Sequence, residues 1–333
     1  MRKEGGPLGR ARRYLTETNA LLGQDPFVVR HDDSNLLFQS GRGDRSITVR
    51  RFETPEEMLK SKPVTLWTPD KKSDHRFELW APEAHNLLNS EGKPRWYIPY
   101  AASDGENENH RKYVLESETA DPLGPYHEVG RPADQHNDHW AIDMTYLQQG
   151  NDLYAIWSGT KDDSSLLPQN LYIAEMSDPW TISGKRQMIS TPDHAWERTI
   201  APINEGPQVL KNGDQTFLVY SADASWANPG YKLGLLEYTG GDVMNPASWV
   251  KHPEPVLDKG GAGHASFVRT DSGENVIYLH RKLSTDNSWR DRVIEHDVFN
   301  FDQATGRPVF QAPTSKVVSL PRLQVVTGFP QVA

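Results

Sequence analysis

The chain has 333 residues, no cysteine and a formal net charge of −9 at pH 7. The lack of cysteine excludes disulfides, thiolate-bound zinc and thiol catalysis. The acidic balance, without a long basic stripe, argues against nucleic acid or an anionic membrane as a partner. There is also no run of about 18 apolar residues that would predict a membrane-spanning helix.

The first twenty residues are charged and contain no apolar segment typical of a signal peptide. We expect residues 1–20 to be an N-terminal extension or a segment that closes the fold. The whole chain, residues 1–333, is predicted to form a single catalytic domain. A cytoplasmic location, or secretion followed by removal of a signal, are both compatible with this sequence.

Five polar residues then recur at intervals of 58, 60, 62 and 59 residues. They are Asp25, Glu83, Asp143, Glu205 and His264. About a dozen positions after each comes an apolar run rich in aromatic or branched side chains, at 36–38, 96–98, 153–157, 217–220 and 276–279. A repeat of this length indicates one supersecondary unit copied five times, with the polar residue at the same place in each copy.

A polar turn and a second strand-like run follow in each copy, at 47–51, 113–116, 171–174, 233–236 and 293–296. Helical periodicity is confined to one short turn around 54–60. Short strands with even spacing predict an all-β fold, a five-bladed β-propeller of four-stranded blades around a central axial pocket. The alternatives fit less well, since a β-helix has a shorter repeat and a β-sandwich does not repeat the order of its elements five times.

Three carboxyl groups lie within or beside strand-like segments, at Asp25, Asp143 and Glu205. Burial of a charged carboxylate is costly unless the group is paired or used. Any one of them could instead cap a turn or hold a neighbouring blade. The inner strands of a propeller would bring all three together, and at least one pKa must then rise. Such a set supplies the acid and the base that cleavage of a glycosidic bond requires.

The sequence around these residues resembles glycoside hydrolase family 43, the five-bladed propellers that include arabinofuranosidases, xylosidases and arabinanases. The resemblance lies in five segments that follow the family's order: DPFVVR at 25–30, WAPEAH at 80–85, AID at 141–143, EGPQV at 205–209 and GAGHASF at 261–267.

The resemblance implies a role for each acid. Asp25 would be the general base that activates water, and Glu205 the general acid that protonates the leaving oxygen. Asp143 would orient Glu205 and keep its pKa raised. The reaction would invert the anomeric centre, for which the two reacting carboxyl groups stand about 6.5–9.5 Å apart rather than the roughly 5–5.5 Å of a retaining pair.

Four further residues are candidates for substrate binding. Trp80 would form an apolar wall for a sugar ring, with Glu83 or His85 hydrogen-bonding near the pocket. Arg292 would hold sugar hydroxyls or a carboxylate. The alternatives are that Trp80 packs between blades, that Glu83 pairs with an arginine, and that Arg292 forms a surface ion pair.

His264 is the candidate metal ligand. In the family, a histidine in this motif faces the axis and holds a calcium or similar ion, mostly through water. Calcium prefers oxygen ligands, so a neutral histidine buried in the core is the alternative. No cofactor is expected to be required for catalysis.

The predicted function is therefore an exo-acting, inverting α-L-arabinofuranosidase that removes terminal arabinofuranose from arabinan, arabinoxylan or arabino-oligosaccharides. A β-xylosidase or an endo-arabinanase would use the same three acids, so both remain alternatives. A propeller that binds sugars without cleaving them would be expected to have lost one acid. The expected partner is an oligosaccharide or polysaccharide, with no nucleic acid, membrane or obligate protein partner.

Overall fold

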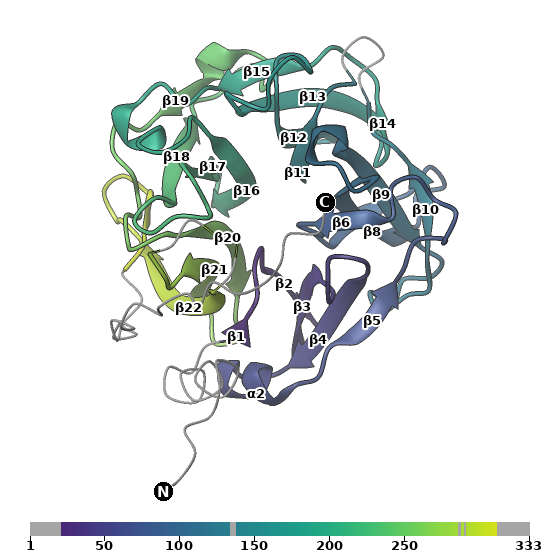
Figure 1. The fold of residues 1–333 in the computed structure, drawn as a ribbon. Coiled ribbons are helices and arrows are strands. Elements are labelled where there is room, and N and C mark those ends of the chain that lie inside the picture. The colour runs from purple at the N-terminus through teal and green to yellow at the C-terminus, as the bar shows by residue number, and fades with distance from the viewer. Residues whose placement is uncertain (1–20, 134–137, 286–287, 290, 312–333) are drawn as a thin grey trace, which may run out of the picture.

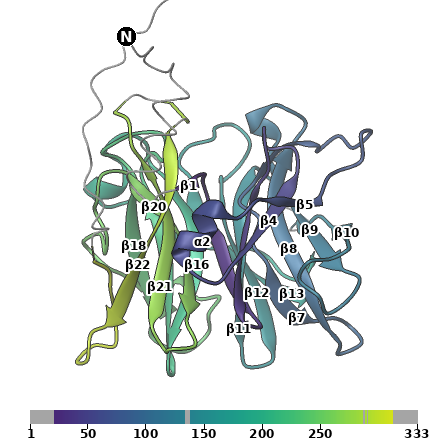
Figure 2. The ribbon, with the colours of Figure 1, turned by 90° about the horizontal axis from the view of Figure 1, so that it is seen from below.

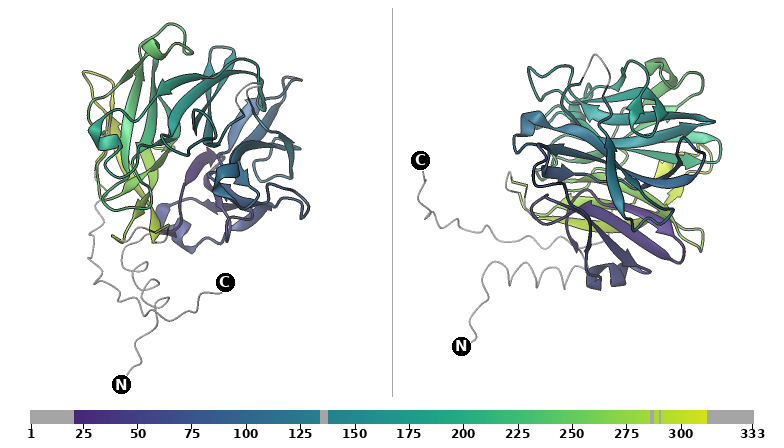
Figure 3. Two further views of the ribbon diagram at one scale, coloured as in Figure 1. Left: turned by 45° about the horizontal axis from the view of Figure 1, so that its top comes forward. Right: turned by 90° about the vertical axis from the view of Figure 1, so that its right-hand side faces the viewer.

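Five antiparallel β-sheets stand in a ring around a common axis and follow one another in chain order (Figure 1). The computed structural model describes residues 21–133, 138–285, 288–289 and 291–311. The predicted five-bladed propeller is confirmed, with four or five strands in each blade. Seen from the side, most strands run roughly along the axis of the ring (Figure 2). The tilted and edge-on views show the same ring (Figure 3).

The blades are numbered here in chain order. Blade 1 consists of β2 (Phe27–His31), β3 (Ser34–Ser40), β4 (Ile47–Phe52) and β5 (Val64–Trp67). Blade 2 consists of β6 (Phe77–Trp80), β7 (His85–Leu88), β8 (Pro94–Ser103), β9 (Arg111–Ser117) and β10 (Tyr126–Gly130). Both β6 and β7 pair with β8, so the inner strand of this blade is interrupted.

The other three blades have continuous inner strands. Blade 3 consists of β11 (Ala141–Gln149), β12 (Asp152–Gly159), β13 (Asn170–Asp178), β14 (Thr181–Ile182) and β15 (Gln187–Ser190). Blade 4 consists of β16 (Asn204–Asn212), β17 (Gln215–Ala222), β18 (Lys232–Tyr238) and β19 (Trp249–Lys251). Blade 5 consists of β20 (Ala262–Arg269), β21 (Asn275–Lys282), β22 (Arg292–Phe301), β23 (Pro308–Val309) and β1 (Leu21–Leu22).

The ring is closed by the first described residues. Leu21 pairs with Ile294 and Leu22 with Val293, so β1 is the outer neighbour of β22 in the last blade. A strand from one end of the chain thus completes a blade made from the other end. The expectation for residues 1–20 falls outside the described residues.

Within the described part of the chain, helix is scarce, as predicted. The short helix α2 (Pro55–Lys60) begins at Thr54, whose hydroxyl accepts a hydrogen bond from the Glu57 amide. Three 3₁₀ turns accompany it, η1 (Asn107–Asn109), η2 (Ala195–Glu197) and η3 (Pro246–Ser248). Among the described residues, no helix is long and apolar enough to cross a bilayer.

The apolar runs predicted from the sequence are the second strands of the blades, and the runs after them are the third strands. Their side chains interlock between neighbouring blades. Phe38 and Ile47 of blade 1 share a buried cluster with Ile98 and Leu115 of blade 2. This packing fixes the blades against one another and so positions the inner strands.

Candidate active site

One backbone irregularity recurs where the inner strands begin. In β11, Asp143 is the first of two residues that face a single residue of β12, a β-bulge. Gly206 in β16 and His264 in β20 begin bulges of the same kind. All three have positive φ, at +55°, +53° and +53° respectively. A bulge re-aims the side chain that it carries, and here it aims successive blades at the same region.

The equivalent place in the first two blades lies two residues before the first regular pair. Asp25 stands two residues before Phe27 and has a φ of +47°. Glu83 stands two residues before His85, and its amide donates a hydrogen bond to the carbonyl of Pro99. Four of the five predicted residues therefore do hold the same place in their blades.

Glu205 is the exception, one residue ahead of the equivalent place, which Gly206 holds. A Cβ on Gly206 would lie only 3.1 Å from Nδ1 of His264 and 3.3 Å from Oγ of Ser221. The close contact therefore favours a glycine where blade 4 approaches His264. The sequence expectation of five equivalent positions is corrected here, because intervals of 58 to 62 residues do not resolve a shift of one.

Basic and imidazole groups surround Asp25. Its Oδ1 lies 3.3 Å from Nδ1 of His264, 3.2 Å from Nδ1 of His280 and 4.0 Å from a terminal nitrogen of Arg292. Burial alone would raise the pKa of Asp25, but these three neighbours outweigh it and hold that pKa well below its usual range. Asp25 is thus an ionised carboxylate at neutral pH.

Asp143 and Glu205 are the other two buried carboxyl groups of the site. Oδ2 of Asp143 accepts a hydrogen bond of 2.9 Å from the Gly206 amide and lies 3.9 Å from Nδ1 of His264. Burial, followed by the charges of Glu205 and Asp25, raises the pKa of Asp143 well above its usual range. Burial likewise raises the pKa of Glu205 to about 7, against the opposing effects of Tyr231 and Arg292.

Asp25, Asp143, Glu205 and His264 form the centre of the candidate site, which is called the pit below. Their different surroundings give Asp25 and Glu205 different protonation states. Asp25 stays ionised, whereas Glu205 holds its proton up to neutral pH. A carboxylate and a carboxylic acid that coexist near one point are the equipment for general base and general acid catalysis.

Comparison with known proteins agrees with this chemistry. The profile described as "Glycosyl hydrolases family 43" matches residues 19–302. The chain belongs to glycoside hydrolase family 43.

Two curated relatives of this family-43 chain are named extracellular exo-α-(1→5)-L-arabinofuranosidase. The one from Streptomyces avermitilis is 34% identical over 80% of this chain and 56% of its own length. The one from Streptomyces chartreusis is 29% identical over 77% of this chain and 78% of its own length. This chain thus spans little more than half of the first of these relatives.

Solved structures share the fold. The crystal structure of an α-L-arabinofuranosidase from Lactobacillus brevis superposes with a TM-score of 0.79 and 29% identity, over 88% of this chain and 95% of the other. A thermostable family-43 glycoside hydrolase superposes with a TM-score of 0.73 and 22% identity, over 91% and 97% of the two chains.

The predicted substrate-binding residues are not all equally accessible. Arg292 lies beside Asp25, and one of its terminal nitrogens donates a hydrogen bond to Oε1 of Gln24. Trp80 is half-buried at the end of β6, where its ring stacks on His110 with centroids 3.9 Å apart. Arg281, the residue after His280, forms a buried ion pair with Glu295.

Glu83 and His85 bind each other rather than facing open space. Oε2 of Glu83 lies 2.9 Å from Nε2 of His85, and Oε1 accepts a hydrogen bond from Gln208 of blade 4. Glu83 is only 2% exposed. The alternative, that Glu83 pairs with an arginine, is wrong. Its partners are His85 and Gln208.

Sequence reasoning missed two residues of the pit. Burial lowers the pKa of His280 to about 4, against the pull of Asp25, so this ring is neutral at pH 7. Burial and then the charge of Asp25 raise the pKa of Asp44 to about 6. In the sequence, His280 ends a strand-like run and Asp44 lies in a polar turn. Neither has a motif, so only the contact of His280 with Asp25 and the charge interaction between Asp44 and Asp25 identify them.

A cleft of about 390 Å³ lies beside Gln24, the residue before Asp25, although none of the three acids is among its lining residues. Its lining includes Gln24, which contacts Arg292, and Asp44 from the loop between β3 and β4. Around the pit, His280 Nε2 and Arg292 Nε are buried without a hydrogen-bond partner among the described residues. Buried polar atoms are normally paired, so these atoms are available to a polar ligand.

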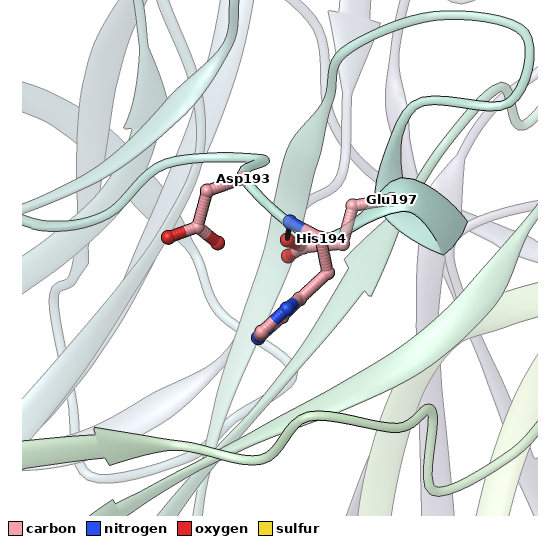
Figure 4. Close-up of side chains that lie close together, drawn as sticks. All are labelled: Asp193, His194 and Glu197. Carbon is pink, nitrogen blue, oxygen red and sulfur yellow. Dashed lines mark hydrogen bonds between the residues drawn. The ribbon is translucent and has the colours of Figure 1, made fainter.

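A second cluster resembles a metal site but is built differently. Potential ligand atoms of Asp193, His194 and Glu197 lie within 4.8 Å of one another (Figure 4). The ammonium group of Lys251 is 3.0 Å from both Asp193 Oδ1 and Glu197 Oε1. Since a lysine cation already pairs with both carboxylates, the cluster is an ion-pair network in which Glu197 is buried and Asp193 is exposed. It also supports the acid, because Glu197 accepts a hydrogen bond from Asn204, the residue before Glu205.

Proposed function

We propose that this chain is an inverting, exo-acting α-L-arabinofuranosidase that releases terminal arabinofuranose from α-1,5-linked arabinan or its oligosaccharides. The observation that carries the proposal is the division between Asp25, whose pKa is lowered, and Glu205, whose pKa is raised to about 7. The names of the relatives from Streptomyces avermitilis and Streptomyces chartreusis support the choice of sugar. Their description as extracellular supports action outside the cell. We also propose that residues 1–333 act as one catalytic domain.

In the proposed mechanism, a water molecule attacks the anomeric carbon while Asp25 removes its proton. Glu205 donates its own proton to the glycosidic oxygen, so the bond from the anomeric carbon to that oxygen breaks as the bond to water forms. Asp143 keeps Glu205 protonated through its nearby carboxyl group and is held in place by the Gly206 amide. The electrostatic influence of His264 and Arg292, together with the hydrogen bond to His280, keeps Asp25 in its basic, charged form.

For substrate binding, we propose that Arg292 and Trp80 contact the sugar that is released. The unpaired atoms of Arg292 and His280 would pair with its hydroxyl groups or with the attacking water. Glu83 and His85 are proposed to act indirectly, because each is the hydrogen-bond partner of the other. Their role would be to hold Gln208 and the lower part of the pit.

We also propose that the calcium ion suggested by the family resemblance binds at His264, mostly through water. Nδ1 of His264 faces the carboxylates of Asp25 and Asp143, which leaves only Nε2 for an ion. One nitrogen is a poor site for a cation that prefers oxygen, so water would have to supply most ligands. We expect dialysis against EDTA to shift the pH profile, with recovery on adding calcium. A profile unchanged by EDTA would exclude the ion.

The test of the function is a substrate screen. We expect hydrolysis of an aryl α-L-arabinofuranoside, little hydrolysis of an aryl β-D-xyloside, and release of arabinose alone from linear arabinan. Proton NMR of the first product should show the β-anomer, which then equilibrates. Activity on the xyloside only, or a first product of retained configuration, would overturn the proposal.

A further inference from the structure

An exposed tryptophan pair borders the candidate active site. Trp289 is 57% exposed, which is unusual for so large an apolar side chain. Its ring lies 5.0 Å from that of Trp226, with a tilt of 56°. Trp226 belongs to the loop between β17 and β18, and Trp289 to the loop between β21 and β22. Two neighbouring blades thus contribute one aromatic surface.

Both loops begin beside catalytic candidates. The last residue of β17, Ala222, pairs with Asn204, the neighbour of Glu205. On the other side, the Arg292 guanidinium carbon lies 5.5 Å from the centre of the Trp289 ring, and Arg292 also contacts Asp25. The aromatic pair therefore stands next to both the candidate acid and the candidate base.

Trp226, the less exposed member of the pair, is anchored in the fold. Trp226 packs against a buried cluster of small apolar residues that includes Ala201, Ile203 and Ala227. The side chain of Asn228 donates a hydrogen bond of 2.8 Å to the carbonyl of Lys282 and so ties the two loops together. A rigid surface loses little conformational entropy on binding a ligand.

We propose that Trp289, backed by Trp226, is the stacking platform for the first sugar ring on the leaving-group side of the scissile bond. The sugar that is released must place its anomeric carbon between Asp25 and Glu205, which are both largely buried. A ring that lies on the exposed face of Trp289 is outside that pit, so it is the next ring of the chain.

The chemistry of a sugar suits this surface. The face of an aromatic ring is electron-rich, and the C–H bonds of a sugar ring present weakly positive hydrogens to it. Its hydroxyl groups remain at the ring's edge, within reach of water or of Arg292. This inference rests on the proposed function, because it assumes that a furanoside is cleaved in the pit.

The test compares two substrates that differ in the leaving group. In α-1,5-arabinotriose the leaving group is a sugar, whereas in 2,2,2-trifluoroethyl α-L-arabinofuranoside it is a small alcohol with no ring. We expect Trp289→Ala to lower kcat/KM on arabinotriose about 10-fold and to change it less than about 2-fold on the trifluoroethyl glycoside. Trp289→Phe should keep most of the activity on arabinotriose.

Leu88→Ala provides a matched control. Leu88 is 63% exposed and ends β7, far along the strand from the pit, so its removal should change neither rate. If Trp289→Ala lowers both rates equally, the residue serves the pit or the loop and the platform is refuted. Unchanged rates on both substrates would refute it as well.

Calorimetric titration with arabinotriose separates this inference from the proposed function. The background is Glu205→Gln, in which the sugar is bound but not cleaved. There, Trp289→Ala should weaken binding about 10-fold. Weaker binding in a protein that hydrolyses no arabinofuranoside would keep the platform and reject the proposed activity. Equal binding with and without Trp289, or no binding of arabinotriose by either protein, would reject the platform.

Discussion

Replacement of Gly206 by alanine should damage both stability and activity, because two separate features of the structure require a glycine there. The first is the backbone, whose φ of +53° costs an L-residue about 1–2 kcal/mol. The second is crowding, since the new Cβ would lie 3.1 Å from Nδ1 of His264. Overpacking of this kind typically adds about 1–3 kcal/mol. We therefore expect a loss of roughly 2–5 kcal/mol in the free energy of unfolding.

The turn between β16 and β17 contains the control. Gly213 has a φ of +57°, almost the same as Gly206, but a Cβ there would have no atom within 4 Å. Gly213→Ala should therefore carry only the backbone cost of about 1–2 kcal/mol. The difference between the two variants isolates the crowding against His264.

The assay is urea unfolding followed by tryptophan fluorescence, together with kcat on an aryl arabinofuranoside. Gly206→Ala should also lower kcat, because the displaced His264 contacts Asp25, and the Gly206 amide donates to Asp143. Gly213→Ala should retain kcat. Equal losses of stability in the two variants, with normal turnover in both, would refute this reasoning.

Three further predictions concern the buried charges. Because burial raises the pKa of Glu205 from 4.5 to about 7, this group makes folding less favourable as the pH rises through that interval. Glu205→Gln should therefore gain about 2–3 kcal/mol relative to the unaltered protein between pH 5 and pH 8 in urea unfolding, and a constant difference would contradict the raised pKa. Asp143→Asn removes a carboxyl that interacts with Glu205, so the alkaline limb of kcat/KM should move to lower pH; a limb that stays near pH 7 would argue against this interaction. Lys251→Met leaves Glu197 buried without its cation and should cost about 3–5 kcal/mol, whereas a negligible loss would show that Glu197 is stabilised by its neutral partners alone.

Much of the architecture follows from local patterns in the chain. Apolar runs such as 217–220 and 276–279 become second strands because alternating or continuous apolar segments of that length must be buried in a sheet. Their fivefold recurrence predicts the propeller, and the polar residues just before each inner strand predict where side chains converge. The helix at Pro55–Lys60 was also foreseeable, since Thr54 and Pro55 are typical of a helix start.

The charge states of the site were decided only by the tertiary structure. A pKa depends on burial and on neighbours, and the neighbours of Asp25 come from 239 to 267 residues away in the chain, at His264, His280 and Arg292. No local pattern marks His280, or the lysine that occupies the cluster of Asp193 and Glu197.

What the sequence by itself determined is therefore the repeat, the strands and the set of acids, because each depends on residues close together in the chain. Only the tertiary structure showed that Glu205 lies one residue before the equivalent place, which Gly206 holds. It alone also showed that Trp226 and Trp289 contact each other beside the pit. Both depend on how separate blades approach one another, and that approach is fixed by the packing of the whole ring.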